Sequence, residues 1–313
     1  MKYIYLLIVM TLTVGSCMAP YQNLRTVEFA DLEYPYPVKF QSLTNRINLA
    51  YVDEGSGDQT IIFIHGLGSY LPAWKKNIAE LKDRYRCIAI DLPGYGKSSK
   101  VPHSGMMEFY ADVLAEFMDK LELKQAVIAG HSMGGQIAIV MSLKYTDKVS
   151  KLLLLDAAGF ETFTEGEKAW FRDVMTVKLV KETTTQQIRA NLISNFYNMP
   201  KDAEFMVTDR IAMRGAKEFE NYCYAVTRSV HGMVDQPVID LLEKITQPTL
   251  IVFGENDNLI PNPVLHGGRS ADIARIGHSK IRNSQLVIIP KCGHFAQFEK
   301  PEEFNKSVRN FLQ

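Results

Sequence analysis

The stretch Val127-Ile128-Ala129-Gly130-His131-Ser132-Met133-Gly134-Gly135 decides how the rest of the chain is interpreted. Its apolar run stops at a glycine, and the residues from Gln136 to Met141 follow at once with helical apolar spacing. A strand that becomes a helix within one residue forces the corner residue into a strained backbone, and its neighbours must be glycine. This geometry lifts the hydroxyl of Ser132 out of a sheet, at the positive end of a helix. The stretch therefore predicts a serine placed for nucleophilic attack.

The composition excludes several classes of function. The 313 residues are 46% hydrophobic and include 35 basic and 35 acidic side chains, so the formal net charge is zero. Without a basic run, nucleic acid and anionic membrane surfaces are poor electrostatic partners. The four cysteines match no metal-ligand spacing, and Gly66-Leu67-Gly68 lacks the other residues of a phosphate-binding or dinucleotide-binding loop. We therefore expect no metal and no organic cofactor.

The first residues, 1–16, are typical of an export signal peptide. Lys2 precedes an uncharged, mostly apolar run of about a dozen residues, which is too short to span a bilayer. The run ends in Val14-Gly15-Ser16-Cys17, which resembles the lipobox of bacterial lipoproteins. This resemblance implies that Cys17 is lipidated, and that the protein is exported and anchored in the cell envelope, on the outer membrane facing the periplasm. An ordinary secretory signal or an N-terminal strand is the alternative.

After a linker at 17–36, buried strands alternate with amphipathic helices, which predicts a mostly parallel α/β sheet with helices on both faces. We expect strands at 38–43, 47–54, 60–64, 87–90, 126–129, 151–155, 248–254 and 285–289, and helices at 74–84, 106–121 and 301–312. Between 160 and 235 there is no strand run, and aromatic residues recur at helical spacing. The prediction is a core at 37–159 and 236–313 with an inserted helical cap at 160–235.

A nucleophilic serine needs a base within hydrogen-bond reach, and the base needs an acid that orients it. In an open parallel sheet, such groups gather at the carboxyl ends of strands. Asp257 follows one late strand and His294 follows the last strand. Glu255 and Asp156 also follow strands and are rival candidates for the acid. The chain order Ser132, Asp257, His294 is the order found in hydrolases with this kind of serine turn.

Five motifs together resemble the α/β-hydrolase superfamily, over nearly everything after residue 37. They are His65-Gly66, Asp91-Leu92-Pro93-Gly94-Tyr95-Gly96, Gly130-His131-Ser132-Met133-Gly134-Gly135, Gly254-Glu255-Asn256-Asp257 and Gly293-His294. The resemblance is greatest to the branch of serine esterases, lipase-like enzymes and carbon–carbon bond hydrolases with a helical cap. It implies that Ser132 attacks an acyl carbonyl, that His294 moves the proton and that Asp257 orients His294. It also implies an oxyanion hole formed by the backbone N–H groups of Leu67 and Met133.

The expected substrate is a small to medium apolar carboxylic ester, cleaved through an acyl-enzyme. The cap should form one wall of an apolar cleft, and we expect Tyr70 and Trp74 near the substrate. Three alternatives stay open: thioester hydrolysis, carbon–carbon bond hydrolysis of the meta-cleavage type, and a receptor-like role in ligand binding. Carbon–carbon hydrolysis would need a partner for a substrate carboxylate, for which Arg189, Arg210 and Arg214 are candidates. Nothing in the sequence indicates the oligomeric state.

Overall fold

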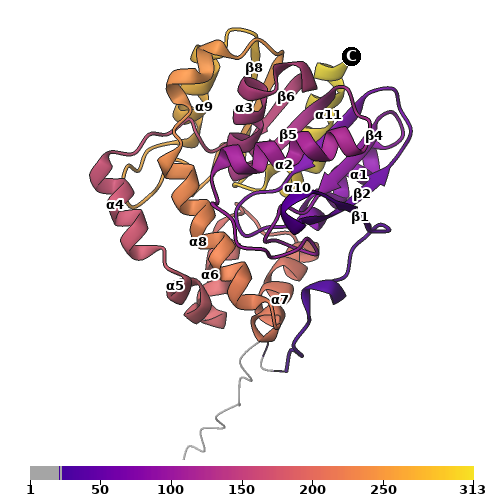
Figure 1. The fold of residues 1–313 in the computed structure, drawn as a ribbon. Coiled ribbons are helices and arrows are strands. Elements are labelled where there is room, and N and C mark those ends of the chain that lie inside the picture. Colours follow the sequence, from indigo (N-terminus) through magenta and orange to yellow (C-terminus); the bar gives the residue numbers. More distant parts are fainter. Residues whose placement is uncertain (1–20, 22) are drawn as a thin grey trace, which may run out of the picture.

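The computed structural model describes residue 21 and residues 23–313, in which eight strands form one mostly parallel sheet flanked by helices (Figure 1). The strands are β1 (Lys39–Ser42), β2 (Asn48–Glu54), β3 (Thr60–Ile64), β4 (Arg86–Ile90), β5 (Ala126–His131), β6 (Val149–Leu155), β7 (Thr249–Gly254) and β8 (Ser284–Ile289). Their order in the sheet is β1-β2-β4-β3-β5-β6-β7-β8, in which β2 runs antiparallel to both of its neighbours, β1 and β4. The predicted fold class is confirmed. The expected signal peptide and Cys17 lie outside the described residues.

Helices cover both faces of the sheet because side chains alternate along each buried strand. The core helices are α1 (Lys75–Leu81), α2 (Met107–Lys120), α3 (Met133–Lys144), α9 (Ser270–Lys280), α10 (Ala296–Glu299) and α11 (Pro301–Leu312). Ile62 and Ile64 pack toward α2, α3 and α9, while Ile61 and Phe63 pack toward α1 and α11. In the described part of the chain, no helix combines the length and apolar character needed to cross a bilayer.

Short 3-10 turns complete the fold. They are η1 (Phe29–Asp31), η2 (Thr44–Arg46), η3 (Leu71–Trp74), η4 (Thr146–Lys148), η5 (Lys201–Ala203), η6 (Met213–Gly215) and η7 (Ile239–Lys244). The helix expected at 74–84 is shorter than predicted, because its first residue belongs to η3 and α1 ends at Leu81.

The chain leaves the sheet after β6 and returns to it at β7, and the helices between these strands form the cap. They are α4 (Glu165–Val174), α5 (Val177–Glu182), α6 (Thr185–Ser194), α7 (Glu204–Ala212) and α8 (Phe219–Asp235). The cap gathers at one end of the molecule, away from α11 and the C-terminus (Figure 1). Gln136 of α3 joins the cap to the core, because its Nε2 donates to the carbonyl oxygens of Met233 and Gln236 at 2.9 and 2.8 Å.

An N-terminal arm, residues 23–37, lies against both the cap and the core. Phe29 is buried, and its ring centroid lies 5.6 Å from that of Tyr222 on α8. Further along, the hydroxyl of Tyr34 donates to Asp91 Oδ2 at 2.5 Å, just after β4. The segment expected as a linker therefore includes residues that pack into the hydrophobic core.

Candidate active site

Ser132 occupies the corner between β5 and α3. Its φ of 54° and ψ of −118° are a conformation that side-chain-bearing residues rarely adopt. A Cβ on Gly130 would lie 2.1 Å from the carbonyl oxygen of Gly134, and a Cβ on Gly134 would lie 2.4 Å from that of Ile64. Glycine is needed at both positions because strand, helix and the neighbouring β3 touch through their backbones. The local sequence therefore fixes the serine at the N-terminus of α3.

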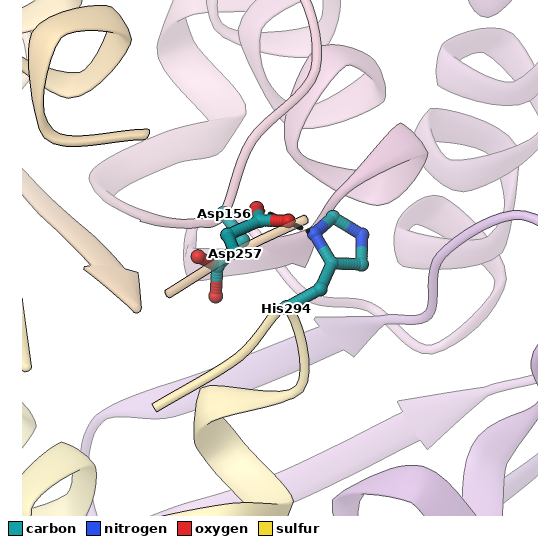
Figure 2. A group of neighbouring side chains, drawn as sticks. All are labelled: Asp156, Asp257 and His294. Carbon is teal, nitrogen blue, oxygen red and sulfur yellow. Dashed lines mark hydrogen bonds and ion pairs between the residues drawn. The ribbon is translucent and has the colours of Figure 1, made fainter. Parts of the chain in front are cut away.

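His294 and Asp257 lie in the loops after β8 and β7, and their side chains meet at the end of the sheet (Figure 2). His294 Nδ1 donates to Asp257 Oδ2 at 2.7 Å, and both side chains are buried. The other oxygen of Asp257 accepts the N–H groups of Leu259 and Ile260 at 2.7 and 3.3 Å. With Nδ1 engaged, Nε2 is the nitrogen that can take a proton from a nucleophile.

Ser132 and His294 line the same cavity, which has a volume of about 420 Å³. In the described chain no hydrogen bond joins their side chains, and such contacts often tighten only when substrate binds. The walls are mainly apolar and come largely from the cap and nearby loops; they include Phe163, Phe171, Met175, Val230, Met233 and Leu259. The structure thus brings the predicted nucleophile and base to one apolar cleft, which we call the main cavity.

The turn after β3 lies against the nucleophile. A Cβ on Gly66 would lie 3.0 Å from the Cβ of Ser132, so the backbone of Leu67 adjoins the serine. Met133 is the first residue of α3 and therefore has no partner for its N–H within the helix. Among the described residues, neither the Leu67 nor the Met133 N–H donates to another protein atom. Both N–H groups therefore remain available to a ligand near Ser132, and their role as an oxyanion hole stays a prediction.

Two buried histidines support this geometry. His65 Nδ1 donates to the carbonyl oxygen of Gly66 at 2.8 Å, while its Nε2 accepts the N–H of Leu92 at 3.0 Å. Burial lowers the pKa of His65 to about 4, so the ring is neutral at physiological pH. His131 Nε2 donates to the carbonyl oxygen of His294 at 2.7 Å. Burial also lowers the pKa of His131 well below its ordinary value.

Asp156, a rival candidate for the acid, lies beside Asp257 (Figure 2). Its Oδ1 accepts the N–H of Gly254 at 2.8 Å, and its Oδ2 is buried without a partner among the described residues. Burial, followed by the charge of Asp257, raises the pKa of Asp156 well above its ordinary value. Donor atoms of Asp156, Asp257 and His294 lie within 4.8 Å of one another, close enough to ligate a metal. The hydrogen bond between the imidazole and Asp257 already uses Nδ1 and Oδ2.

Two expected substrate contacts are not part of the main cavity. Trp74 is fully buried, with its ring centroid 5.0 Å from that of Phe63. It packs on the face of the sheet covered by α1 and α11, so the prediction that it lies near the substrate is wrong. Tyr70 is also buried, and its hydroxyl donates to Asp209 Oδ2 at 2.5 Å.

Tyr70 instead lines a second, smaller cavity of about 50 Å³. The two cavities share walls at Leu67, Asn191, Asn195 and Phe295, and therefore adjoin at the oxyanion turn. This small cavity is also where one of the three candidate arginines lies.

Arg210 of α7 lines the small cavity. Its Nη2 donates to the carbonyl oxygen of Gly68, and its guanidinium carbon lies 5.0 Å from the ring centroid of Tyr222. No carboxylate of the described residues lies within 4.0 Å of this guanidinium. Arg189 and Arg214 line neither cavity.

Glu161 is a cavity residue that sequence reasoning did not single out. It lies in the loop between β6 and α4 and lines the main cavity. No motif marks this loop, and its place in the cavity follows from how the cap folds back over the sheet. A charged residue soon after a strand end is the only signal that could have drawn attention to it.

Comparisons with known proteins agree with this geometry. A profile of the alpha/beta hydrolase fold matches residues 59–301, and the chain belongs to this family. A 2-hydroxy-6-oxononadienedioate/2-hydroxy-6-oxononatrienedioate hydrolase of Pseudomonas putida is 29% identical over 288 residues, which are 88% of this chain and 95% of the relative.

Two solved structures extend the comparison. A probable hydrolytic enzyme of Pseudomonas aeruginosa has a TM-score of 0.82 at 25% identity, with 93% of this chain and 99% of that chain covered. A thermophilic esterase of Thermogutta terrifontis has a TM-score of 0.72 at 27% identity, with 88% and 98% covered. The predicted superfamily is confirmed, and the chain is a hydrolase of this fold.

Proposed function

We propose that this hydrolase cleaves a carbon–carbon bond in a 2-hydroxy-6-oxo-dienoate, which has a carboxylate at one end and a ketone at C6. The observation that carries the proposal is Arg210, a cation without a carboxylate partner among the described residues, in a small cavity at the oxyanion turn. A guanidinium in this position can bind a substrate carboxylate through two hydrogen bonds. The name of the Pseudomonas putida relative supports the same substrate class.

In this proposal the two cavities hold the two arms of the substrate. The arm with the carboxylate extends toward Arg210, and the acyl arm beyond the ketone occupies the apolar main cavity. The ketone then lies between them, near Ser132 and the N–H groups of Leu67 and Met133. A simple apolar ester, which was the favoured expectation, has no carboxylate to pair with the charge of Arg210.

In the proposed reaction Ser132 Oγ attacks the ketone carbon while His294 Nε2 takes the hydroxyl proton. Asp257 stabilises the imidazolium, and the two backbone donors hold the oxyanion, each typically worth roughly 3 kcal/mol. Fragmentation requires the 2-oxo tautomer of the substrate, in which the proton of the 2-hydroxyl has moved to C5. The bond between C5 and C6 then breaks, and its electron pair is delocalised over the unsaturated 2-oxo acid near Arg210. The resulting dienolate takes the proton from His294. Water finally hydrolyses the acyl ester on Ser132 and releases the acid.

The test compares two substrates on the same protein. We expect 2-hydroxy-6-oxohepta-2,4-dienoate to be consumed with a kcat/KM at least about 100-fold above that of p-nitrophenyl butyrate. Ser132→Ala should lower kcat for both by at least about 1,000-fold, because the nucleophile is lost. Arg210→Met should raise KM for the dienoate and leave the ester, which has no carboxylate, nearly unchanged.

Ester hydrolysis is the second candidate, because the main cavity is mostly apolar and the esterase of Thermogutta terrifontis is 27% identical. Turnover of the ester with no consumption of the dienoate would select it and reject carbon–carbon cleavage. A fluorophosphonate probe tests the receptor-like alternative. Rapid labelling that is lost in Ser132→Ala supports an enzyme, whereas slow labelling of the wild type supports a ligand-binding role.

A further inference from the structure

The main cavity contains a negative charge that the proposed reaction does not use. The side chain of Glu161 is 10% exposed and lines this cavity. Its Oε1 accepts the N–H of Asn262 at 2.8 Å and lies 2.5 Å from His266 Nδ1. No described residue donates a hydrogen bond to its Oε2, so that oxygen remains available to a ligand.

The surroundings offset this negative charge only in part. His266 lies between two carboxylates, with its Nε2 3.1 Å from Glu167 Oε1. Burial would lower the pKa of His266, but the hydrogen bond to Glu161 and the charge of that carboxylate outweigh burial and raise the pKa. Even with a charged imidazole, the three side chains carry a net negative charge. Among the described residues, no lysine or arginine lines the main cavity.

The combined site therefore has opposite charges in its two cavities, with Arg210 in the small one and Glu161 in the main one. We propose that Glu161 determines substrate specificity by excluding a second carboxylate at the end of the acyl arm. The substrate would then have one carboxylate, bound at Arg210, and a neutral acyl arm. This inference rests on the proposed function for the assignment of the two arms.

The substrate proposed for this chain differs from the compound for which the matching relative is named. The Pseudomonas putida enzyme is named for a dienedioate, a compound with two carboxylates. In the present chain the second carboxylate would enter a cavity with mainly apolar walls, several amide side chains and the open oxygen of Glu161. Like charges brought together in such a site weaken binding by a large factor, which is how a protein rejects a wrong ligand.

Binding of two matched acids tests the proposal without any turnover. Octanoate and octanedioate differ only in the second carboxylate, and calorimetry gives the Kd of each for the full protein. For the wild type we expect octanedioate to bind roughly 10- to 100-fold more weakly than octanoate. Glu161→Gln keeps the oxygen that accepts the Asn262 N–H but removes the charge. It should reduce this difference about tenfold, and an unchanged far-ultraviolet circular dichroism spectrum serves as the check on folding.

Glu167→Gln is the matched control, because Glu167 contacts the same histidine but does not line the cavity. It should leave the preference for octanoate as in the wild type. Equal binding of the two acids by the wild type overturns the proposal. A preference for octanoate that remains in Glu161→Gln also overturns the proposal, because the apolar walls alone would then explain the selection.

Kinetics separate this proposal from the proposed function. If carbon–carbon cleavage is correct, Glu161→Gln should raise the ratio of kcat/KM for 2-hydroxy-6-oxononadienedioate to kcat/KM for 2-hydroxy-6-oxohepta-2,4-dienoate by at least about tenfold. If the wild type consumes neither dienoate, the proposed function fails. The binding comparison of octanoate and octanedioate then still decides whether Glu161 selects against a second carboxylate.

Discussion

Two buried carboxyl groups lie side by side at the end of the sheet, in different surroundings. Asp257 accepts two backbone N–H groups and the imidazole N–H of His294. Asp156 has a buried Oδ2 without a partner among the described residues. Burial, and then the charge of Asp257, raises the pKa of Asp156 well above its ordinary value. Two adjacent buried carboxylates cannot both ionise without a large cost, so Asp156 is the neutral member of the pair.

Replacing each acid by its amide should therefore have very different effects on catalysis. Asp257→Asn retains the shape but removes the charge and presents a donor to His294, so we expect kcat to fall by roughly 1,000- to 10,000-fold. Asp156→Asn replaces a neutral acid by a neutral group of the same shape, and kcat should stay within about threefold of the wild type. Steady-state kinetics on the substrate that the protein consumes measures both. A large loss of kcat in Asp156→Asn would identify Asp156 as the orienting acid instead.

The same pair makes a prediction about stability and pH. Because Asp156 keeps its proton in the folded chain above its ordinary pKa of 3.8, its contribution to stability is fully present below that pH and is lost as pH rises. Asparagine does not ionise, so the Asp156→Asn variant does not lose this stability as pH rises. Its free energy of unfolding should therefore exceed that of the wild type at neutral pH and match it near pH 3. Urea unfolding at several pH values measures the difference. A less stable variant at neutral pH would contradict the assignment.

The sequence was most informative where a local motif is tied to a strand end. Ser132, Asp257 and His294 each follow a strand, so their place at one edge of the sheet could be predicted. Trp74 belongs to a turn whose side chains face the opposite side of the sheet, and residue spacing alone did not reveal which side. Glu161 is brought to the cavity by the packing of a long insertion, which depends on contacts between distant residues.

At the scale of elements, the N-terminal arm connects the two parts of the fold. Phe29 is 2% exposed, and Lys100 Nζ of the core lies 4.0 Å from the centroid of its ring. On the cap side, the ring of Phe29 lies beside that of Tyr222 on α8. The sequence of this arm has no clear periodicity, so its packing could not be predicted, whereas the apolar spacing of the cap indicated helices. The arm should therefore stabilise the position of the cap on the core.

Phe29→Ala tests this role. Removing a fully buried aromatic ring from such a contact should lower the free energy of unfolding by about 3–5 kcal/mol. Leu24→Ala, on the same arm, is the control: this side chain is 39% exposed, and its loss should cost less than about 0.5 kcal/mol. Urea unfolding measures both variants. Equal destabilisation by the two would mean that the arm contributes through its backbone and not through the aromatic contact.

At the scale of the whole molecule, Tyr21 places the start of the described chain beside the cap. The hydroxyl of Tyr21 donates to Glu204 Oε1 at 2.5 Å, just at the start of α7. It also accepts a hydrogen bond from Arg189 Nε of α6 at 3.2 Å. Only three residues of sequence lie between Cys17 and Tyr21. At about 3.5 Å per step over four steps, the Cα atom of Cys17 can lie no further than about 14 Å from that of Tyr21.

A lipid anchor at Cys17 would therefore hold the cap close to a membrane surface, and we propose that the protein is anchored in this way. Cys17→Ala should remove the lipid acceptor, so the protein should neither incorporate radiolabelled palmitate nor sediment with the membranes of a bacterial host. Met18→Ala, at the next position, should retain both properties and serves as the control. Because the anchor is separate from the active site, purified Cys17→Ala protein should keep the kcat/KM of the wild type. A wild-type protein that carries no label and stays in the soluble fraction would rule out the anchor and leave an ordinary secretory signal as the explanation for the apolar start of the sequence.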